Sequence, residues 1–246
     1  MQWSDQGVVL STRRHGETSA IVQILTKDHG RHAGLVRGGS GRKARGVFQP
    51  GNEVSVIWRA RLEEQLGTFT VEMIRPRVAM VLDDPLRLAA LVAAAELMEI
   101  TLAERQPNPG VHASLTELMD AIETAPDWSA DYVRWEMAML AELGFGLDVS
   151  NAEAGAMISS RSGEPIEAGQ LPSAGERLLP LPGFLRGGMM GTPETIIQGL
   201  ALTGFFIERA LDAPGRILPS RTRLVERLAR LDTTSGVKPQ DGCEGD

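Results

Sequence analysis

Residues 19–37 read SAIVQILTKDHGRHAGLVR, and this stretch decides the fold that the sequence predicts. Ser19–Thr26 and Arg31–Arg37 are rich in apolar and β-branched residues, which is typical of strands. Lys27–Gly30 separates them, and its glycine supplies the positive φ that a tight turn needs. The stretch therefore predicts two antiparallel strands joined by a short turn.

Further strand patterns lie on either side of this hairpin. Gly7–Arg13 (GVVLSTR) precedes it, and Glu53–Arg61 (EVSVIWRAR) and Leu66–Arg75 follow it. In Glu53–Arg61 the apolar residues Val54, Val56 and Trp58 alternate with polar ones, although Ile57 breaks the pattern. Five short strands within about 75 residues predict a small barrel of the OB-fold kind.

After Pro76 the pattern changes to that of helices. Asp84-Pro85 is a typical helix start, because aspartate caps the helix and proline is tolerated at its first position. The predicted helices cover residues 85–104, Val111–Ala125, Ala130–Leu143 with Gly144 as a left-handed C-cap, 193–211 with Thr192 as its cap, and Ser220–Leu231. Residues 145–191 are rich in Gly, Pro and Ser and predict an irregular insertion, and residues 232–246 predict a disordered tail.

The expected fold class is therefore α+β, with a five-stranded OB-fold barrel first and an all-helical domain second. The expected domains are 1–77 and 78–231, followed by the tail. Either packing of Leu178–Leu181 and Phe184 holds the insertion, or the insertion is mobile.

Charge is distributed very unevenly along the chain. The 246 residues carry a formal net charge of −7, which taken alone argues against a nucleic-acid partner. Residues 1–77, however, hold 12 Lys and Arg against 7 Asp and Glu, a net charge of +5, and the remaining residues therefore carry −12. This asymmetry favours an anionic partner for the first domain.

Several classes of protein are excluded by composition. Cys243 is the single cysteine, so an internal disulfide and a cysteine-rich zinc site are impossible, and a reducing cytoplasm is expected. The N-terminal sequence does not resemble a secretory signal. The most apolar window, Leu86–Ala103, contains Arg87, Glu96 and Glu99 and predicts a buried helix, not a membrane span.

The segment Arg37–Arg45 (RGGSGRKAR) carries the clearest functional signal. Arg37, Arg42, Lys43 and Arg45 are interleaved with three glycines and a serine in a predicted loop between two strands. Glycines allow close approach of a phosphodiester backbone, and the cations neutralise its phosphates. A merely solvated, flexible hairpin explains the spacing equally well.

Other cations extend this signal. Lys27 and Arg31 in the preceding turn, Arg59 and Arg61 on the fourth strand, and Arg13 as a further extension complete a predicted basic groove of the kind in which OB-folds bind single strands. Few aromatic residues accompany these cations, and Trp58 is expected in the core. Binding through the nucleic-acid backbone, with little reading of sequence, is therefore expected.

The sequence offers no convincing catalytic or cofactor site. His29 and His32 lack a nearby third ligand, and Asp83-Asp84 is better explained as a helix cap than as a magnesium site. No nucleotide-binding motif is present. We expect no catalytic residue, no metal and no cofactor.

The last predicted helix is unusually basic. Arg216, Arg221, Arg223 and Arg227 lie in or near it, with Arg230 beyond them. A solvated helix face explains this series, and a binding site for an anionic partner is the alternative.

The chain resembles the RecO family of bacterial recombination mediators. The resemblance lies in a series of short motifs in order along the chain: 7–10 (GVVL), 14–19 (RHGETS), 26–31 (TKDHGR), 35–39 (LVRGG), 48–51 (FQPG), 143–148 (LGFGLD), 178–182 (LLPLP) and 218–221 (LPSR). Each motif is short, but their joint order covers most of the chain and is far more specific than any one of them.

This resemblance implies a non-catalytic role in DNA repair and in the RecF pathway of homologous recombination. It implies binding of single- and double-stranded DNA, annealing of complementary strands, and partnership with RecR and with the C-terminal tail of single-stranded-DNA-binding protein (SSB). With RecR, such a protein helps to load RecA onto SSB-coated DNA in the cytoplasm, in association with the nucleoid. No membrane partner is implied.

Residue by residue, the resemblance assigns DNA contact to Arg37, Arg42, Lys43 and Arg45. Arg216, Arg221, Arg223 and Arg227 are candidates for the SSB tail, because that peptide is acidic and apolar. One departure is clear: many family members carry cysteines in the insertion that form a zinc-finger-like element, whereas Ala152 stands where the first is expected here.

Two alternatives from other classes remain. In one, the OB-fold is a protein-interaction scaffold whose Arg/Gly loop has no direct DNA role. In the other, the chain is an enzyme acting on nucleic acid, which would require a carboxylate cluster that the sequence does not offer.

Overall fold

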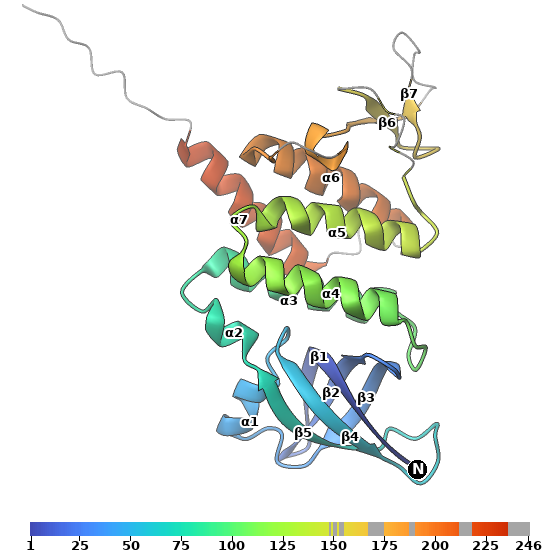
Figure 1. Ribbon diagram of the computed structural model, residues 1–246, viewed down its shortest axis with the longest axis vertical. Coiled ribbons are helices and arrows are strands. Elements are labelled where there is room, and N and C mark those ends of the chain that lie inside the picture. The colour runs from blue at the N-terminus through green and yellow to red at the C-terminus, as the bar shows by residue number, and fades with distance from the viewer. Residues whose placement is uncertain are drawn as a thin grey trace, which may run out of the picture.

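The computed structural model contains an N-terminal barrel and a helical domain above it (Figure 1). The structure describes residues 1–147, 149, 152, 155–166, 175–186, 190–211 and 218–235. Of Lys43 and of residues 231–235, only the backbone is described.

Five strands close the barrel in the order β1-β2-β3-β5-β4, which confirms the predicted OB-fold class. The strands are β1 (Gln2–His15), β2 (Ser19–Thr26), β3 (Gly30–Val36), β4 (Glu53–Arg59) and β5 (Thr68–Arg75). The predicted boundaries are correct to within a few residues, except that β1 begins five residues earlier than its apolar pattern suggested. Its early part, Gln2–Gly7, is polar because it pairs with β4 at the barrel's rim.

Buried residues alternate with more exposed ones along β4, and the buried ones point into the barrel interior. Val54, Val56 and Trp58 are almost completely buried and pack with residues of β1, β2 and β5, as predicted. Gly30 at the β2–β3 turn has a φ of +68°, the conformation for which the predicted turn needed glycine.

The segment predicted as a basic loop contains a short helix instead. This helix, α1 (Arg42–Val47), lies between β3 and β4. Residues 42–45 are good helix formers, and the amide of Phe48 bonds to the carbonyl of Ala44 at the end of the helix. Phe48 is buried in the barrel core and anchors this end. The glycine-rich part is confined to residues 38–41, which is why the composition suggested a loop throughout.

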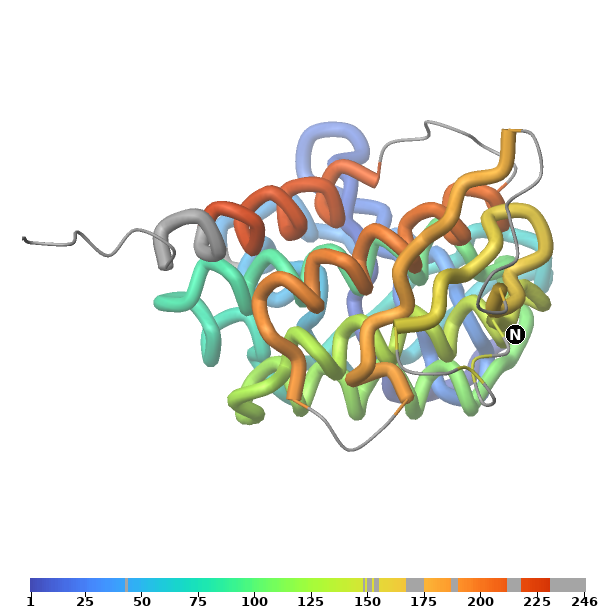
Figure 2. The backbone as a smooth tube through the Cα atoms, turned by 90° about the horizontal axis from the view of Figure 1, so that it is seen from above, coloured from blue at the N-terminus to red at the C-terminus, as the bar shows by residue number. Residues whose placement is uncertain are grey.

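Six helices form most of the second domain: α2 (Arg77–Met80), α3 (Pro85–Thr101), α4 (Pro109–Thr124), α5 (Trp128–Glu142), α6 (Pro193–Ala210) and α7 (Pro219–Ser235). The predicted caps are confirmed: the Asp84 side chain accepts hydrogen bonds from two amides of α3, and Thr192 caps α6. Gly144 follows α5 with a φ of +80°. α6 packs against both α5 and α7 (Figure 2).

The insertion is more ordered than its composition predicted. It contains a three-stranded sheet of β6 (Met157–Ser159), β7 (Pro165–Ile166) and β8 (Leu178–Pro180), followed by a 3-10 turn, Gly183–Arg186. Leu179, Leu181 and Phe184 are buried in the helical core, which confirms the expected packing. These strands were not predicted because segments of two or three residues, separated by glycine and proline, are too short to show a periodic pattern.

The tail also differs from expectation. α7 continues to Ser235, so residues 232–235 are helical and not disordered. The remainder of the predicted tail, residues 236–246, lies outside the described residues.

The barrel and the helical domain share one core. Val8, Leu10 and Leu25 on the barrel's outer face belong to the same apolar cluster as the buried residues of α3. A buried ionic network adds to this contact: Arg77 bonds to Glu53 of β4 and to Asp120 and Glu123 of α4 at 2.6–3.1 Å.

Candidate nucleic-acid interface

Exposed cations gather at one end of the barrel. Arg13 and Arg14 lie on β1, where they pair with the first residues of β2, and Arg37 directly follows β3. Arg42 and Arg45 lie on α1, next to the same turn. These five arginines are exposed, and together with the backbone of α1 they form what we call the basic end of the barrel.

An open cleft lies within the basic end. It has a volume of about 590 Å³, and its walls come from β1, from the β1–β2 turn and from α1. Arg14 and Arg45 line it together with the small polar residues Thr12 and Ser40. Glu17 also lines the cleft, so the charges that suit an anion such as a phosphodiester are those of the two arginines.

Hydrogen bonds hold the walls of the cleft in place. Ser40 donates its amide to the carbonyl of Thr18 at 3.1 Å and its hydroxyl to that of Glu17 at 3.0 Å. On the other side, the hydroxyl of Thr12 donates to the carbonyl of Phe48 at 3.0 Å. Gly38 lies between them with a φ of +72°. The glycine-rich segment is thus a defined turn and not a free hairpin.

The arginines of the basic end have few intramolecular partners. Within the part of the chain that the structure describes, no ion pair is recorded for Arg13, Arg37, Arg42 or Arg45. Arg14 donates to the carbonyls of Gly16 and Glu17. The charges of these side chains are therefore available to an external anion. The side chain of Lys43 lies outside the described part.

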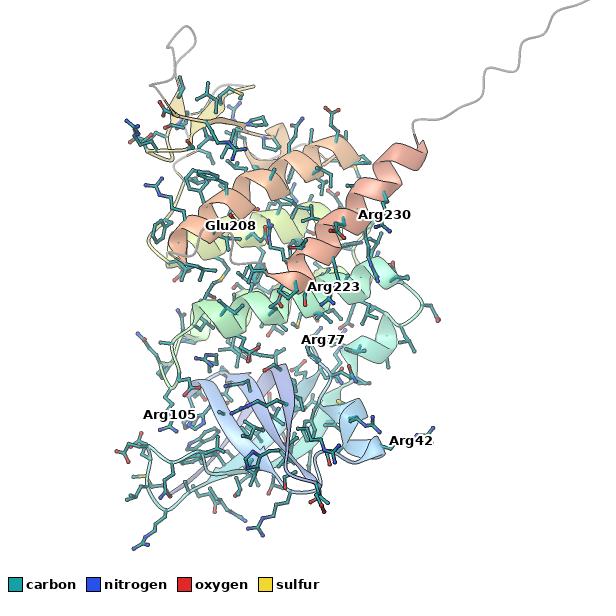
Figure 3. The ribbon with its side chains drawn as sticks, turned by 180° about the vertical axis from the view of Figure 1, so that it is seen from behind. Arg42, Arg77, Arg105, Glu208, Arg223 and Arg230 are labelled. Atoms are coloured by element: carbon teal, nitrogen blue, oxygen red, sulfur yellow. The ribbon has the colours of Figure 1, made fainter. Side chains whose placement is uncertain are left out.

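The remaining predicted cations of the barrel lie elsewhere. Lys27 lies in the β2–β3 turn, at the far end of β2 from Arg14, and the eight residues of β2 place these ends about 23 Å apart. Arg59 and Arg61 lie where β4 ends, with Arg59 bonded to Gln2 at 2.8 Å. The prediction of one continuous groove is therefore wrong: the cations form two groups at opposite ends. Figure 3 places Arg42 at one end of the barrel and Arg105 at the other.

Arg31 belongs to neither group. Its guanidinium donates to the carbonyl of Leu102 at 2.9 Å and lies 3.4 Å from Glu104, so it contacts the helical domain. The segment after α3 covers the face of β2 and β3 at this point, because the amide of Arg105 bonds to the carbonyl of Arg31 and Gln23 reaches Glu104. OB-folds commonly bind oligonucleotides on the face of strands 2 and 3. Here the helical domain occupies part of that face, which leaves the basic end as the open cationic surface.

The predicted partner-binding arginines have different environments. Arg221 is directed inward: it makes an ion pair of 2.7 Å with Glu136, which is completely buried, and it also donates to Thr203. Arg221 therefore stabilises the helical core and does not form part of a surface. Arg223, labelled in Figure 3, and Arg227 lie on the exposed side of α7, with bonds to Ser220 and to the carbonyl of Pro85. Arg216 lies outside the described residues.

Two features of the barrel were not predicted from the sequence. One is Asn52, which is buried and donates its side-chain amide to the carbonyls of Gly46 and Val47 at the end of α1. A single asparagine between two strands gave no sign of this role. The other is the environment of the two histidines: His29 stacks on Trp3 at 4.0 Å between ring centroids, and His32 is buried beneath them.

The described residues include no group of three or more His, Cys, Asp or Glu side chains arranged to hold a metal ion. In the same part of the chain, no helix is both long and apolar enough to cross a membrane. The geometry of the basic end can bind an anion and hold it, and the clearest chemistry that it supports is contact with a phosphate backbone.

Comparison with known proteins finds two family models that match this chain. The family model described as recombination protein O N terminal matches residues 1–77, and the model described as recombination protein O C terminal matches residues 82–216. The chain is 45% identical over 249 residues to the DNA repair protein RecO of Rhodospirillum centenum, covering 97% of this chain and 99% of that protein. It is 45% identical over 240 residues to a RecO of Cereibacter sphaeroides, with 94% and 100% covered, and 44% identical over 247 residues to that of Rhodospirillum rubrum, with 94% and 97% covered.

Proposed function

Since the chain belongs to the RecO family of DNA repair proteins, we propose that it acts in recombination as a non-catalytic mediator. In this role it binds single- and double-stranded DNA, and it anneals complementary strands in the cytoplasm, on the DNA of the nucleoid. The observation that carries the proposal is the basic end of the barrel. There two exposed arginines, Arg14 and Arg45, line an open cleft, and no ion pair to a carboxylate is found for the exposed arginines of this end among the described residues.

Contact with phosphates explains how such a surface assists annealing. Two complementary strands repel each other through their backbones, and cations that neutralise phosphates lower this repulsion. Arg13, Arg37, Arg42 and Arg45 are long side chains for which the described part of the chain provides no ion-pair partner, so they can follow a backbone without requiring a given sequence. The mediator therefore holds strands of any sequence and leaves their bases free to pair.

The proposal includes protein partners on the acidic helical domain. With RecR, the protein helps to load RecA onto strands coated by SSB, and it receives the acidic C-terminal tail of SSB. Arg223 and Arg227 support this part of the proposal, because both lie on the exposed side of α7, where an acidic peptide can reach their charges.

An annealing assay with purified full-length protein tests the function. Two complementary oligonucleotides are mixed in the presence of a chelator and without any nucleotide, and duplex formation is followed in time. The proposal predicts faster annealing with the protein than without it. Cleavage of the strands would identify an enzyme instead, and absence of any DNA binding would favour the protein-interaction scaffold.

A further inference from the structure

A second cleft lies at the opposite end of the barrel from the basic end. It has a volume of about 460 Å³, and rings form a large part of its wall: Trp3, His29, His32 and Trp58. We call it the aromatic cleft. The loop between β4 and β5 closes one side through Glu63, and the segment after α3 closes another through Arg105 and Pro107.

The rings of the aromatic cleft form an ordered stack. Trp3 and Trp58 are paired residues of β1 and β4, and their rings lie 5.6 Å apart at an angle of 17°. His29 continues the stack, with its ring 4.0 Å from that of Trp3 and 9° from parallel. His32 meets both tryptophans edge-on. Trp58 and His32 are buried, whereas Trp3 and His29 remain partly exposed, so the outer members of the stack face the solvent.

A buried carboxylate fixes the outermost ring. Asp5 accepts hydrogen bonds from His29 at 2.8 Å and from the amides of Asp28 and Gln6. The side chain of Asp5 is only 4% exposed, whereas that of His29 is 34% exposed. The imidazole is thus held in one orientation with part of its surface open, and among the described residues it belongs to no group that could hold a metal ion.

Among the described residues, Arg105 is the cation in the wall of this cleft, and the second group of cations lies beside the cleft, next to its lining residues Gln2 and Asp28. Lys27 is exposed in the turn that carries His29, and Arg59 and Arg61 are exposed where β4 ends, on either side of Ala60, whose carbonyl accepts a bond from the N-terminal amine. Two carboxylates, Asp28 and Glu63, also line the cleft, so a phosphate is expected outside it, toward the cations beside it.

From this arrangement we propose that the aromatic cleft binds an unpaired base of single-stranded DNA. Single-strand-binding proteins combine aromatic platforms for bases with cations for the backbone, and here the rings of the cleft have cations beside them. Asp28 and Glu63 in the cleft can accept a hydrogen bond from an N–H group at the edge of a base, such as the N3–H of thymine. The inference rests on the proposed function, because it requires that the protein bind DNA at all.

In this proposal the two ends of the barrel bind different parts of a DNA strand. The basic end holds backbones without rings and accepts both single and double strands. The aromatic cleft accepts only a base that is not stacked within a duplex, since a paired base has to be flipped out at a cost of a few kcal/mol. Release of the base from the cleft on pairing gives the protein a way to hold single strands more firmly than the annealed product.

Binding of two matched oligonucleotides tests the inference. One is oligothymidylate, and the other has the same number of phosphates but abasic sugars. Wild-type protein is expected to bind the base-containing strand about tenfold more tightly, a ratio typical of the loss of one stacking contact. His29→Ala is expected to remove this preference and His29→Phe to restore it, because phenylalanine provides a ring without the imidazole's hydrogen bond.

Arg42→Ala combined with Arg45→Ala provides the control at the other end. It is expected to weaken binding of both oligonucleotides and to leave their ratio unchanged. An equal affinity of the wild-type protein for both strands would overturn the aromatic cleft while leaving DNA binding intact. Binding of neither strand would instead reject the proposed function. A cleft that serves a protein partner also predicts equal affinities.

Tryptophan fluorescence of the wild-type protein offers a second measurement that needs no variant. Trp128 and Trp135 are buried in the helical domain, so Trp3 is the tryptophan most open to a ligand of the barrel. Oligothymidylate is expected to quench the emission, and the abasic strand is expected to leave it unchanged. Identical quenching by both strands would contradict stacking in the cleft.

Discussion

Arg77 is a cation held inside the molecule, at the junction of the two domains. Its side chain is 1% exposed, and it contacts three carboxylates from β4 and α4. Burial alone would lower the pKa of Arg77, but the hydrogen bonds that its guanidinium donates to Asp120 and Glu123 raise the pKa overall, so the guanidinium stays charged. One of its partners, Glu123, is only 3% exposed and depends on arginine for its neutralisation.

Replacement of Arg77 by alanine is therefore expected to be strongly destabilising. It removes the buried partner of Glu123 and leaves this carboxylate with Arg75, which is 39% exposed, so a cost of about 3–5 kcal/mol in the free energy of unfolding is expected. Urea unfolding measures this value. Arg75→Ala is the matched control, because Arg75 binds the same two residues of α4 from a position 39% exposed and is expected to cost about 1 kcal/mol or less. Equal effects of the two substitutions would contradict the role of burial.

The buried side chain of His32 allows a prediction of how the stability of the protein depends on pH. Burial beneath Trp3 and Trp58 lowers the pKa of His32, and the hydrogen bond to the carbonyl of Ala33 does not offset this effect. The folded-state pKa then lies below the unfolded value of about 6.5. The unfolded state binds more protons in this range, so stability is present above pH 6.5 and is lost as the pH falls below about that value.

A variant isolates the contribution of this histidine. The free energy of unfolding of the wild-type protein is expected to fall between about pH 7.5 and pH 5.5, and that of His32→Phe is expected to fall less. His112, whose pKa burial also lowers, is present in both proteins and cancels in the comparison. Identical pH dependence of the two proteins would show that His32 does not contribute.

At the scale of elements, α1 is the part most directly tied to the proposed function. Its six residues carry Arg42 and Arg45, and such a short helix is not stable alone. Asn52 compensates by bonding to the last carbonyls of α1, while its own oxygen accepts the amide of Val78 in α2 at 3.1 Å. One buried side chain thus connects the basic helix to the junction between the domains.

Loss of this side chain is expected to loosen α1. Asn52→Ala leaves buried backbone groups without partners, which costs about 1–3 kcal/mol in stability. Amide hydrogen exchange in α1 is expected to accelerate. Gln49→Ala is the control, since Gln49 is exposed and makes a single bond to the carbonyl of Arg45 at 3.1 Å; we expect it to change stability by about 0.5 kcal/mol or less. Unchanged exchange in α1 after Asn52→Ala would contradict the positioning role.

The helices and strands show which structural features the sequence patterns predict and which they do not. Alternation predicted β2, β3, β4 and β5, and capping residues predicted the starts of α3 and α6, because these signals are local. α1 was missed because three glycines precede it and its six residues make fewer than two turns. The partner of Arg221 was missed because Glu136 lies 85 positions away along the chain.

The candidate site was likewise predicted only in part. The residue types at the basic end were identified correctly, because clustered arginines and glycines are visible in the sequence. Their separation from Lys27, Arg59 and Arg61 follows from closure of the barrel, which places the two ends of β2 far apart. The stack of Trp3 and His29 depends on pairing between strands distant in the sequence, so no periodicity predicts it.

At the scale of the whole molecule, the two domains behave as one structural unit. Val8, Leu10 and Leu25 of the barrel lie in the core of the helical domain, and Ser11 of β1 donates to Glu99 of α3 at 2.5 Å. Separation of the domains would expose this surface to water. We therefore expect a single cooperative thermal transition, with circular dichroism and tryptophan fluorescence changing together. Two separate transitions would show independent domains.

Charge distribution complements this rigid arrangement. A barrel with a net charge of +5 is fixed to a remainder with a net charge of −12, so DNA is attracted to one part and repelled by the other. Because the domains share a core, the basic end keeps a constant orientation toward the acidic helices. The overall charge of −7 is therefore no guide to the surface that DNA meets.

The salt dependence of single-strand binding tests the central claim most directly. Affinity is measured at several salt concentrations for the wild-type protein, for Arg42→Ala with Arg45→Ala, and for a control with Arg161→Ala and Arg186→Ala, two exposed arginines outside the barrel. If each arginine of α1 contacts one phosphate, the α1 variant reduces the slope of log K against log salt by about 1.4 in magnitude, at about 0.7 per phosphate. The control, which removes the same charge, is expected to leave the slope unchanged. A slope that falls equally in both variants, or in neither, would contradict a backbone-binding site at the basic end.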